Sequence, residues 1–215
     1  MRHANIGDAA RSWGATAKTW GASCALLLAA TVICGVVYTG ACTGVAQLVF
    51  PHQANGSIIE VDGGKYGSEL VAQEFHDEDH MWGRIMNANP GTFVNDAGEP
   101  VMWYGPSNLS PASAEFEAVV CDRLAKIEEA HPEMRGVPVP SDLVTCSGSG
   151  FDPHISPAAA EYQVKRLAKN TGMSESEIRS IIDQCTDRPM LGILGDAGVN
   201  VLEVNLMIDG VLAHK

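Results

Sequence analysis

The chain has 215 residues, of which 26 are acidic and 14 are basic, so its formal net charge is −12. The acidic excess lies beyond residue 50, because residues 1–50 contain three basic residues and one acidic residue. A surface of this sign argues against nucleic-acid binding, since phosphates need basic partners. The length fits one anchored domain of ordinary size.

The first predicted element is a membrane helix. Residues 19–59 contain no Asp, Glu, Lys or Arg, and the most apolar part is Ala22–Tyr38. A spanning helix needs about 20 mostly apolar residues, because the hydrocarbon core is about 30 Å thick. We therefore predict a cytoplasmic leader over residues 1–20, a transmembrane helix over 21–50 and a soluble domain over 51–215.

The charges beside this helix predict its direction. Arg2, Arg11 and Lys18 all precede it, and basic residues favour the cytoplasmic side of a membrane. The expected protein is a single-pass protein of the cell membrane, with a cytoplasmic N-terminus and an extracytoplasmic domain. The alternatives are a cleaved signal peptide and a lipoprotein whose mature chain begins near Cys42.

Glycines in the predicted helix offer positions of close approach. Gly40 and Gly44 form a small-xxx-small pattern, and Gly35 lies further up the helix. Small residues let neighbouring membrane helices approach closely. These three glycines are the predicted packing positions for partner helices.

The first part of the soluble domain contains weak signals. Residues 51–57 read as a linker, and residues 58–105 read as turns and short strands. The run His76–His80 contains five potential metal ligands, yet they are consecutive and not spaced along one helical face. No two cysteines have CxxC spacing. We expect a solvated loop at His76–His80 and no metal.

The second part contains clearer helix signals. Ser110-Pro111 predicts a helix that runs to about Ala130, and Ser156-Pro157 predicts another that ends near Gly172. Ser174 and Glu177 form a capping box before a third helix. The segments Asp142–Cys146 and Val199–Leu206 read as strands. Interleaved helices and strands without a βαβ repeat predict an α+β exported domain attached to one N-terminal transmembrane helix.

A glycine-rich turn, Ser147–Gly150, follows the first of these strands. Backbone N–H groups at such a turn bind anions, but the lysine of a nucleotide-binding P-loop is missing. Ser147, Asp152 and His154 suggest a membrane-tethered exported hydrolase as an alternative function, and a binding module is a second. No GxSxG elbow accompanies them, so we expect no catalytic residue.

An ordered set of motifs spans most of the chain from Ala22 to Ile208, fading between Phe75 and Pro106. The motifs are Gln53–Ser57, Asp142–Thr145, Ser147–Gly150, Asp152–Ala160, Tyr162-Gln163-Val164 with Arg166, Leu191-Gly192 with Gly195, and Val199–Leu202 with Asn205-Leu206. Together they resemble the KdpC subunits of bacterial potassium-transporting KdpFABC ATPases.

This resemblance implies a noncatalytic subunit of an ATP-driven potassium uptake pump. Its partners would be the channel-like KdpA, the P-type ATPase KdpB and the small KdpF, and the complex would handle potassium. The family is described as a catalytic chaperone that raises the nucleotide affinity of KdpB, so ATP would be a cofactor shared with that subunit.

The resemblance and the turn together give the candidate nucleotide contacts, which are Ser147, Gly148, Ser149, Gly150 and Gln163. The alternative is that the turn only begins a helix and that Gln163 is a surface amide. From its charge and orientation, we also expect the acidic domain to cap the outer mouth of the potassium pathway.

Overall fold

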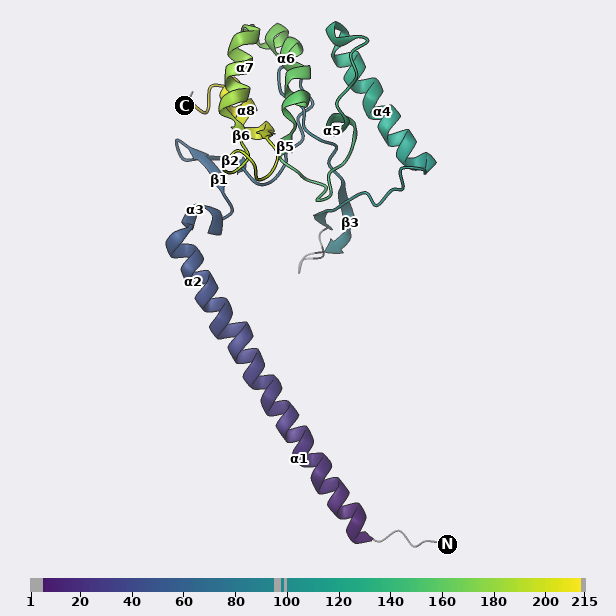
Figure 1. Cartoon of the computed structure of the whole chain (residues 1–215), viewed down its shortest axis with the longest axis vertical. Helices are drawn as coiled ribbons and strands as arrows, with labels where there is room; N and C mark the ends of the chain where they lie inside the picture. Colours follow the sequence, from purple (N-terminus) through teal and green to yellow (C-terminus); the bar gives the residue numbers. More distant parts are fainter. Residues whose placement is uncertain (1–5, 95–97, 99, 214–215) are drawn as a thin grey trace. The chain divides into compact units, whose positions relative to one another are not determined.

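The structure is a computed structural model that describes residues 6–94, 98 and 100–213. It divides into two compact units, Met1–Gly56 and Ser57–Lys215. The first unit is helical, and the second contains helices and small sheets (Figure 1). The predicted α+β class with one N-terminal helix is therefore confirmed.

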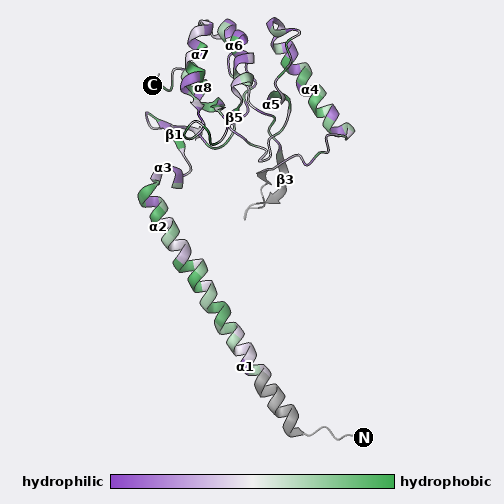
Figure 2. Cartoon of the chain, viewed as in Figure 1, coloured by the Kyte–Doolittle hydropathy of each residue, from purple (hydrophilic) through white to green (hydrophobic). Residues whose placement is uncertain are grey.

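The first unit is one helical run. It comprises α1 (Ile6–Ala30), a π-helical segment η1 (Thr31–Tyr38), α2 (Thr39–Val49) and the short α3 (Pro51–Ala54). Residues 1–5 of the predicted leader lie outside the described residues. Thr16–Val49 is long and apolar enough to cross a membrane. Figure 2 shows this apolar colouring along the helix.

The second unit begins with a hairpin of β1 (Ile58–Val61) and β2 (Gly64–Ser68). Asp62 and Gly63, which join the strands, both have positive φ, at 51° and 78°. An Asp-Gly pair tolerates this conformation, and the resulting turn matches the twist of a hairpin. A second antiparallel hairpin pairs β3 (Ala88–Val94) with β4 (Pro100–Tyr104).

The rest of the second unit packs helices around a small sheet. Antiparallel β5 (His154–Ile155), β7 (Gly198–Asn200) and β6 (Thr186–Asp187) lie side by side in that order. The helices are α4 (Ala114–Ala130), the short 3₁₀ helix η2 (Pro132–Met134), α5 (Ser141–Val144), α6 (Pro157–Thr171), α7 (Glu175–Gln184) and α8 (Val201–Ile208). Figure 1 shows α6 and α7 beside each other and α8 next to the sheet.

Local capping signals explain where α6 and α7 begin and end. The Ser156 hydroxyl accepts a hydrogen bond from the N–H of Ala159, and Gly172 closes α6 in the left-handed conformation. Ser174 and Glu177 form both halves of a capping box at α7. These predictions are confirmed, because each cap satisfies backbone groups that the helix leaves free.

The predicted start of α4 is wrong by one turn. Ser110 lies in a turn, where its carbonyl accepts from the N–H of Ser113. Ser113 has the extended backbone of an N-cap and accepts from the N–H of Phe116. The proline at position 111 therefore belongs to the turn before the helix and not to its first turn.

One predicted strand of the second half is wrong, and the other is correct only for its first two residues. Residues 141–144 form α5, and Thr145 ends it. The segment from Val199 continues as a strand only to Asn200, whose side chain accepts from the N–H of Glu203 and caps α8. Val204 and Met207 then lie buried on the helix. Tertiary packing overrides the β-propensity of these valines.

The core gathers around α6, α7 and α8. Its fully buried apolar residues include Ile127, Leu143, Ala159, Val164, Leu167, Ile178, Ile181, Val199 and Val204. A smaller cluster joins Ile59 of β1 to Leu202 and Leu206 of α8. Several polar side chains are buried among these residues, and they organise the site described next.

Candidate functional site

The loop His76–Trp82 is anchored to α6 by a buried amide. The Gln163 Oε1 atom accepts from the Trp82 N–H at 2.8 Å, and Gln163 Nε2 donates to the Trp82 carbonyl at 2.9 Å. A third bond runs from Nε2 to the Ala159 carbonyl. Gln163 is fully buried, so the alternative reading of a surface amide is wrong.

One turn further along α6, a buried guanidinium binds the same loop. Arg166 is 2% exposed, and it donates to the carbonyls of Asp77, Glu78 and His80. It also donates to Gln163 Oε1 at 2.8 Å. Burial lowers the pKa of Arg166 to about 10, so the group keeps its charge at neutral pH. This charge is matched by carbonyl dipoles and not by one buried carboxylate.

A neutral histidine completes the polar core. The Nδ1–H of His131 donates to the Ile127 carbonyl at 2.7 Å, and its Nε2 accepts from Arg166 Nε at 2.9 Å. Burial lowers the pKa of His131 to about 4, and the Arg166 charge acts in the same direction. The Trp82 ring packs beside this network, and the guanidinium carbon of Arg166 lies 4.8 Å from the ring centroid.

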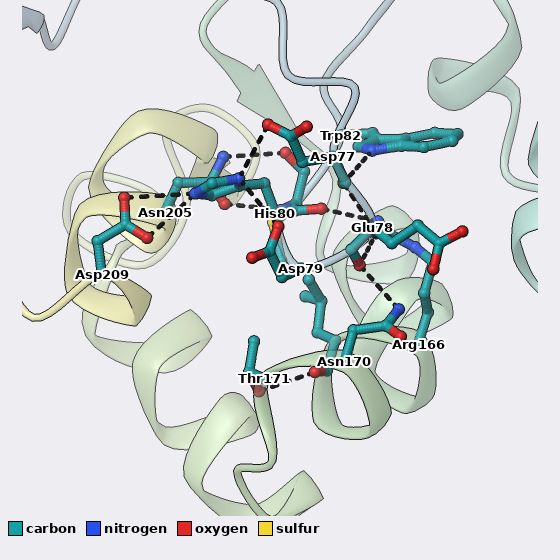
Figure 3. A network of polar contacts seen from close by, with 12 residues as sticks. Asp77, Glu78, Asp79, His80, Trp82, Arg166, Asn170, Thr171, Asn205 and Asp209 are labelled. Atoms are coloured by element: carbon teal, nitrogen blue, oxygen red, sulfur yellow. Dashed lines mark hydrogen bonds and ion pairs between the residues drawn. The ribbon is translucent and has the colours of Figure 1, made fainter.

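Helix α8 and the end of α6 hold the other side of the loop (Figure 3). Asn205 accepts from the Met81 N–H at 2.7 Å and donates to the Met81 carbonyl at 3.0 Å. Asn170 donates to the Glu78 carbonyl at 3.0 Å. The prediction of a loop at His76–His80 is confirmed, and residues 76–79 are exposed to solvent. Its backbone is nevertheless held by side chains of α6, which the sequence did not predict.

Sequence reasoning missed four residues of this network, namely His131, Arg166, Asn170 and Asn205. A signal for two of them is present in the sequence. Arg166 lies beside Leu167 and three residues after Gln163, on the buried face of a helix. Asn205 interrupts the apolar run from Val199. Polar residues on a core face need buried partners, but nothing local identifies those partners.

The glycine-rich turn Ser147–Gly150 satisfies its own polar groups. The Ser147 hydroxyl accepts from the Gly150 N–H at 2.9 Å and lies 3.1 Å from the Ser149 hydroxyl. Gly148 and Ser149 are exposed, whereas Ser147 and Gly150 are buried. The turn leads into β5 and not directly into a helix. The strand–turn–helix context expected for it is therefore wrong.

Position 150 requires a glycine, because the backbone of Gly105 approaches it closely. The φ of Gly150 is +80°, and a Cβ atom at this position would lie 2.1 Å from the Gly105 carbonyl oxygen. The Gly150 carbonyl also accepts from the Asn87 N–H at 3.0 Å. The turn thus joins the β3–β4 hairpin to the core, which accounts for this glycine without a ligand.

The residues of the hydrolase alternative do not form a triad. His154 Nε2 lies 3.1 Å from an Asp187 carboxylate oxygen, and the backbone N–H of His154 donates to the Asp152 carboxylate. The Ser147 hydroxyl bonds within its own turn instead of to the imidazole. A serine nucleophile needs hydrogen-bond contact with its base, so this geometry does not support acyl transfer.

Long runs of apolar side chains are exposed at two places within the described residues. No side chain between Thr16 and Val49 is buried, and a Cβ atom at Gly35, Gly40 or Gly44 would meet nothing within 4 Å. In the second unit, the turn Met190–Leu194 exposes four large apolar side chains, each at least 53% accessible. Contiguous exposed apolar surface is typical of interaction sites.

Comparisons with known proteins agree on one family. The family described as KdpC, K⁺-transporting ATPase, c chain, matches residues 20–210. A potassium-transporting ATPase KdpC subunit of Clostridium botulinum (strain Alaska E43) is 57% identical over 182 residues, covering 85% of this chain and 90% of that protein. A subunit of the same name from Clostridium perfringens is 51% identical, covering 86% and 94%. The protein of that name from Sorangium cellulosum is 43% identical, with the same two coverages.

Proposed function

Since the chain belongs to the KdpC family of potassium-transporting ATPase c chains, we propose that it is a noncatalytic subunit of an ATP-driven potassium uptake pump. Its expected partners are a channel-like KdpA subunit, a P-type ATPase KdpB and the small KdpF. The described polar clusters contribute to the fold, because their groups bond to one another and to the backbone.

The bare helix is the observation that carries this proposal. Thr16–Val49 buries no side chain within its own chain, while the second unit has a complete core. Lipid chains can cover the apolar side chains of this helix. Glycines, however, are of use only where a second helix approaches the backbone closely. The face marked by Gly40 and Gly44, and the separate position Gly35, would therefore pack against helices of other subunits.

We assign the second unit to the extracytoplasmic side, because the basic residues near the helix precede it. Cys121 of α4 is exposed, so it reports on this orientation. A membrane-impermeant maleimide should label Cys121 in spheroplasts, and Cys121→Ser should reduce that labelling. Labelling only after the inner membrane is opened would place the unit in the cytoplasm.

An acidic extracytoplasmic domain suits a position at the outer mouth of the potassium pathway. The excess negative charge lies beyond residue 50, and such a surface concentrates cations near it. The apolar turn Met190–Leu194 would be covered by a pump subunit. Neutralising acidic residues near the mouth should weaken the apparent potassium affinity at low ionic strength, where screening is least.

The nucleotide part of the proposal is indirect. An exported domain does not meet cytoplasmic ATP, so the chain would raise the nucleotide affinity of the ATPase subunit through its membrane helix. Direct contact would instead use the exposed residues Gly148 and Ser149, since the Gln163 amide bonds are taken by the loop. The KM for ATP of the assembled pump separates the two routes, because Ser149→Ala changes it only under direct contact.

Co-purification tests membership of the pump. The tagged chain is isolated in mild detergent from its own cells grown under potassium limitation, and its intact mass is measured. We expect a full-length chain together with KdpA and KdpB. Recovery of the chain alone would overturn the proposal, and a mature chain beginning near Cys42 would favour the lipoprotein.

A further inference from the structure

We propose that Asp77, Asp79 and His80 form a binding site for one divalent transition-metal ion of the zinc class. A ligand atom from each of the three residues lies within 4.8 Å of the other two. This inference concerns the loop His76–Trp82 and does not rest on the proposed function. It replaces the expectation that this chain has no metal of its own.

The distances from the imidazole to the two carboxylates match a tetrahedral site. His80 Nδ1 lies 3.3 Å from Asp79 Oδ1 and 3.6 Å from Asp77 Oδ2. Zinc binds imidazole nitrogen and carboxylate oxygen at about 2.0–2.2 Å, so two ligands of a tetrahedral zinc are about 3.3–3.5 Å apart. One ion placed among these atoms would therefore reach all three with small side-chain movements.

The imidazole presents a nitrogen that makes no hydrogen bond to the two carboxylates. His80 Nδ1 is inaccessible to solvent and makes no hydrogen bond, although both carboxylates face it. On the other side of the ring, Nε2 lies 3.1 and 3.3 Å from the Asp209 carboxylate oxygens. Asp209 thereby favours the tautomer with a proton on Nε2, which leaves the Nδ1 lone pair toward Asp77 and Asp79 (Figure 3).

The backbone that carries the ligands is already ordered. Arg166 binds the carbonyls of Asp77 and His80, and Asn170 binds the carbonyl between them. Binding a metal would therefore order only two carboxylate side chains, which keeps the entropic cost low. Asp77 and Asp79 are exposed, at 78% and 56% of their side chains. Their exposure leaves a path for the ion and room for water as a fourth ligand.

The ligand types select the class of ion. Calcium and magnesium prefer all-oxygen sites with six or more ligands, whereas imidazole suits zinc and its neighbours. The other histidine between two carboxylates, His154, offers a different geometry. Its Nδ1 lies near Asp152 and its Nε2 near Asp187, so one ion does not reach both carboxylates and the ring.

Titration of the full-length chain with zinc tests the site. The chain, carrying a tag without histidine, is stripped with a chelator in detergent, and zinc is added in competition with a chromophoric chelator. We expect one zinc per chain, no comparable binding of calcium or magnesium, and a thermal midpoint that rises with zinc. Cobalt in place of zinc should give the intense visible absorption of tetrahedral coordination.

Variants connect that binding to these residues. Asp79→Asn and His80→Gln should weaken zinc binding at least 100-fold, and Asp209→Asn should weaken it about 10- to 100-fold because it only orients the imidazole. His76→Gln is the matched control, since His76 is exposed in the same loop and pairs with Glu74. It should bind zinc as the unmodified chain does.

Two outcomes would overturn the proposal. One is the absence of saturable zinc binding by the unmodified chain. The other is equal affinity in Asp79→Asn and His80→Gln, which would place the zinc on other histidines of the chain. Asp79 is exposed and its carboxylate supports no described element, so Asp79→Asn should remain folded, as circular dichroism can check.

Discussion

The two units of this chain differ in whether their side chains are buried within the chain. The helix Thr16–Val49 buries nothing, and its glycines face open space. In the unit Ser57–Lys215, even a guanidinium and an imidazole are buried and bonded to one another. The helix therefore depends on surroundings outside the chain, whereas the second unit holds its loops with its own side chains.

This difference separates two kinds of mutation. Changes in the polar core should lower the stability of the second unit, whether or not partner subunits are present. Changes on the glycine face should leave that stability intact and affect assembly. The following predictions are ordered by the expected loss of stability, measured on the full-length chain in detergent.

The largest loss is expected for Arg166→Leu. The substitution leaves the carbonyls of Asp77, Glu78 and His80 without their buried donor. We expect the free energy of unfolding to fall by about 3–4 kcal/mol. Near-ultraviolet circular dichroism during denaturant unfolding gives the value, because Trp82 lies against Arg166.

Arg179→Ala is the matched control for that experiment. Arg179 is 45% exposed and pairs with Glu161 and Glu175 on the surface. Exposed ion pairs contribute at most about 1 kcal/mol, so this variant should unfold near the unmodified chain. Equal losses for the two arginine variants would show that the buried network does not hold the loop.

Gly150→Ala is expected to have the next largest effect. The left-handed backbone and the 2.1 Å approach to the Gly105 oxygen both oppose a side chain. We expect a loss of about 2–3 kcal/mol. Gly148→Ala, two residues earlier in the same turn, meets nothing within 4 Å and should be nearly neutral. An unchanged free energy of unfolding in Gly150→Ala would contradict the close backbone contact between the turn and Gly105.

Stability should also depend on pH through His131. Its pKa is lowered to about 4 in the folded chain, compared with about 6.5 in an unfolded chain. Below pH 6.5 the unfolded chain therefore binds a proton that the folded chain does not accept. The stability is complete above this pH, and about 2–3 kcal/mol should be lost between pH 6.5 and pH 4.

The variant His131→Gln isolates this contribution. Gln carries no titrating group, so the stability of the variant should fall less steeply between pH 6.5 and pH 4. Denaturant midpoints of both proteins at several pH values provide the comparison. Identical slopes would mean that His131 does not resist protonation in the folded chain.

The smallest loss of stability is expected for Gly40→Leu combined with Gly44→Leu. Both positions are exposed, so the second unit should melt as before, while the yield of co-purified pump subunits should fall about tenfold. Ala41→Leu adds similar bulk about 100° around the helix and is the control. Full recovery of subunits with the double variant would exclude the glycine face as a contact.

Local signals explain which elements the sequence predicts correctly. The caps at Ser156, Ser174 and Gly172 involve neighbours within one turn, so residue types alone indicate them. The apolar length of the membrane helix is equally local. One local signal nevertheless gave a wrong prediction. Ser110 was expected to cap α4, but Ser113, one turn later, is the N-cap.

The rest of the fold and the candidate sites depend on contacts across the chain. Arg166 binds carbonyls of residues 77–80, and Asn205 binds Met81. His80 gains its ligand geometry from Asp209 on another element. The run His76–His80 therefore reads as a solvated loop in sequence, although its order comes from residues far away in the chain.

Potassium-stimulated ATP hydrolysis tests the proposed subunit role most directly. The measurement compares the chain alone, the pump purified with the chain, and the pump purified from cells that lack it. We predict no hydrolysis by the chain alone, and a loss of potassium-stimulated hydrolysis when the chain is missing. Hydrolysis by the isolated chain, or full activity of the pump without it, would contradict a noncatalytic subunit on which the pump depends.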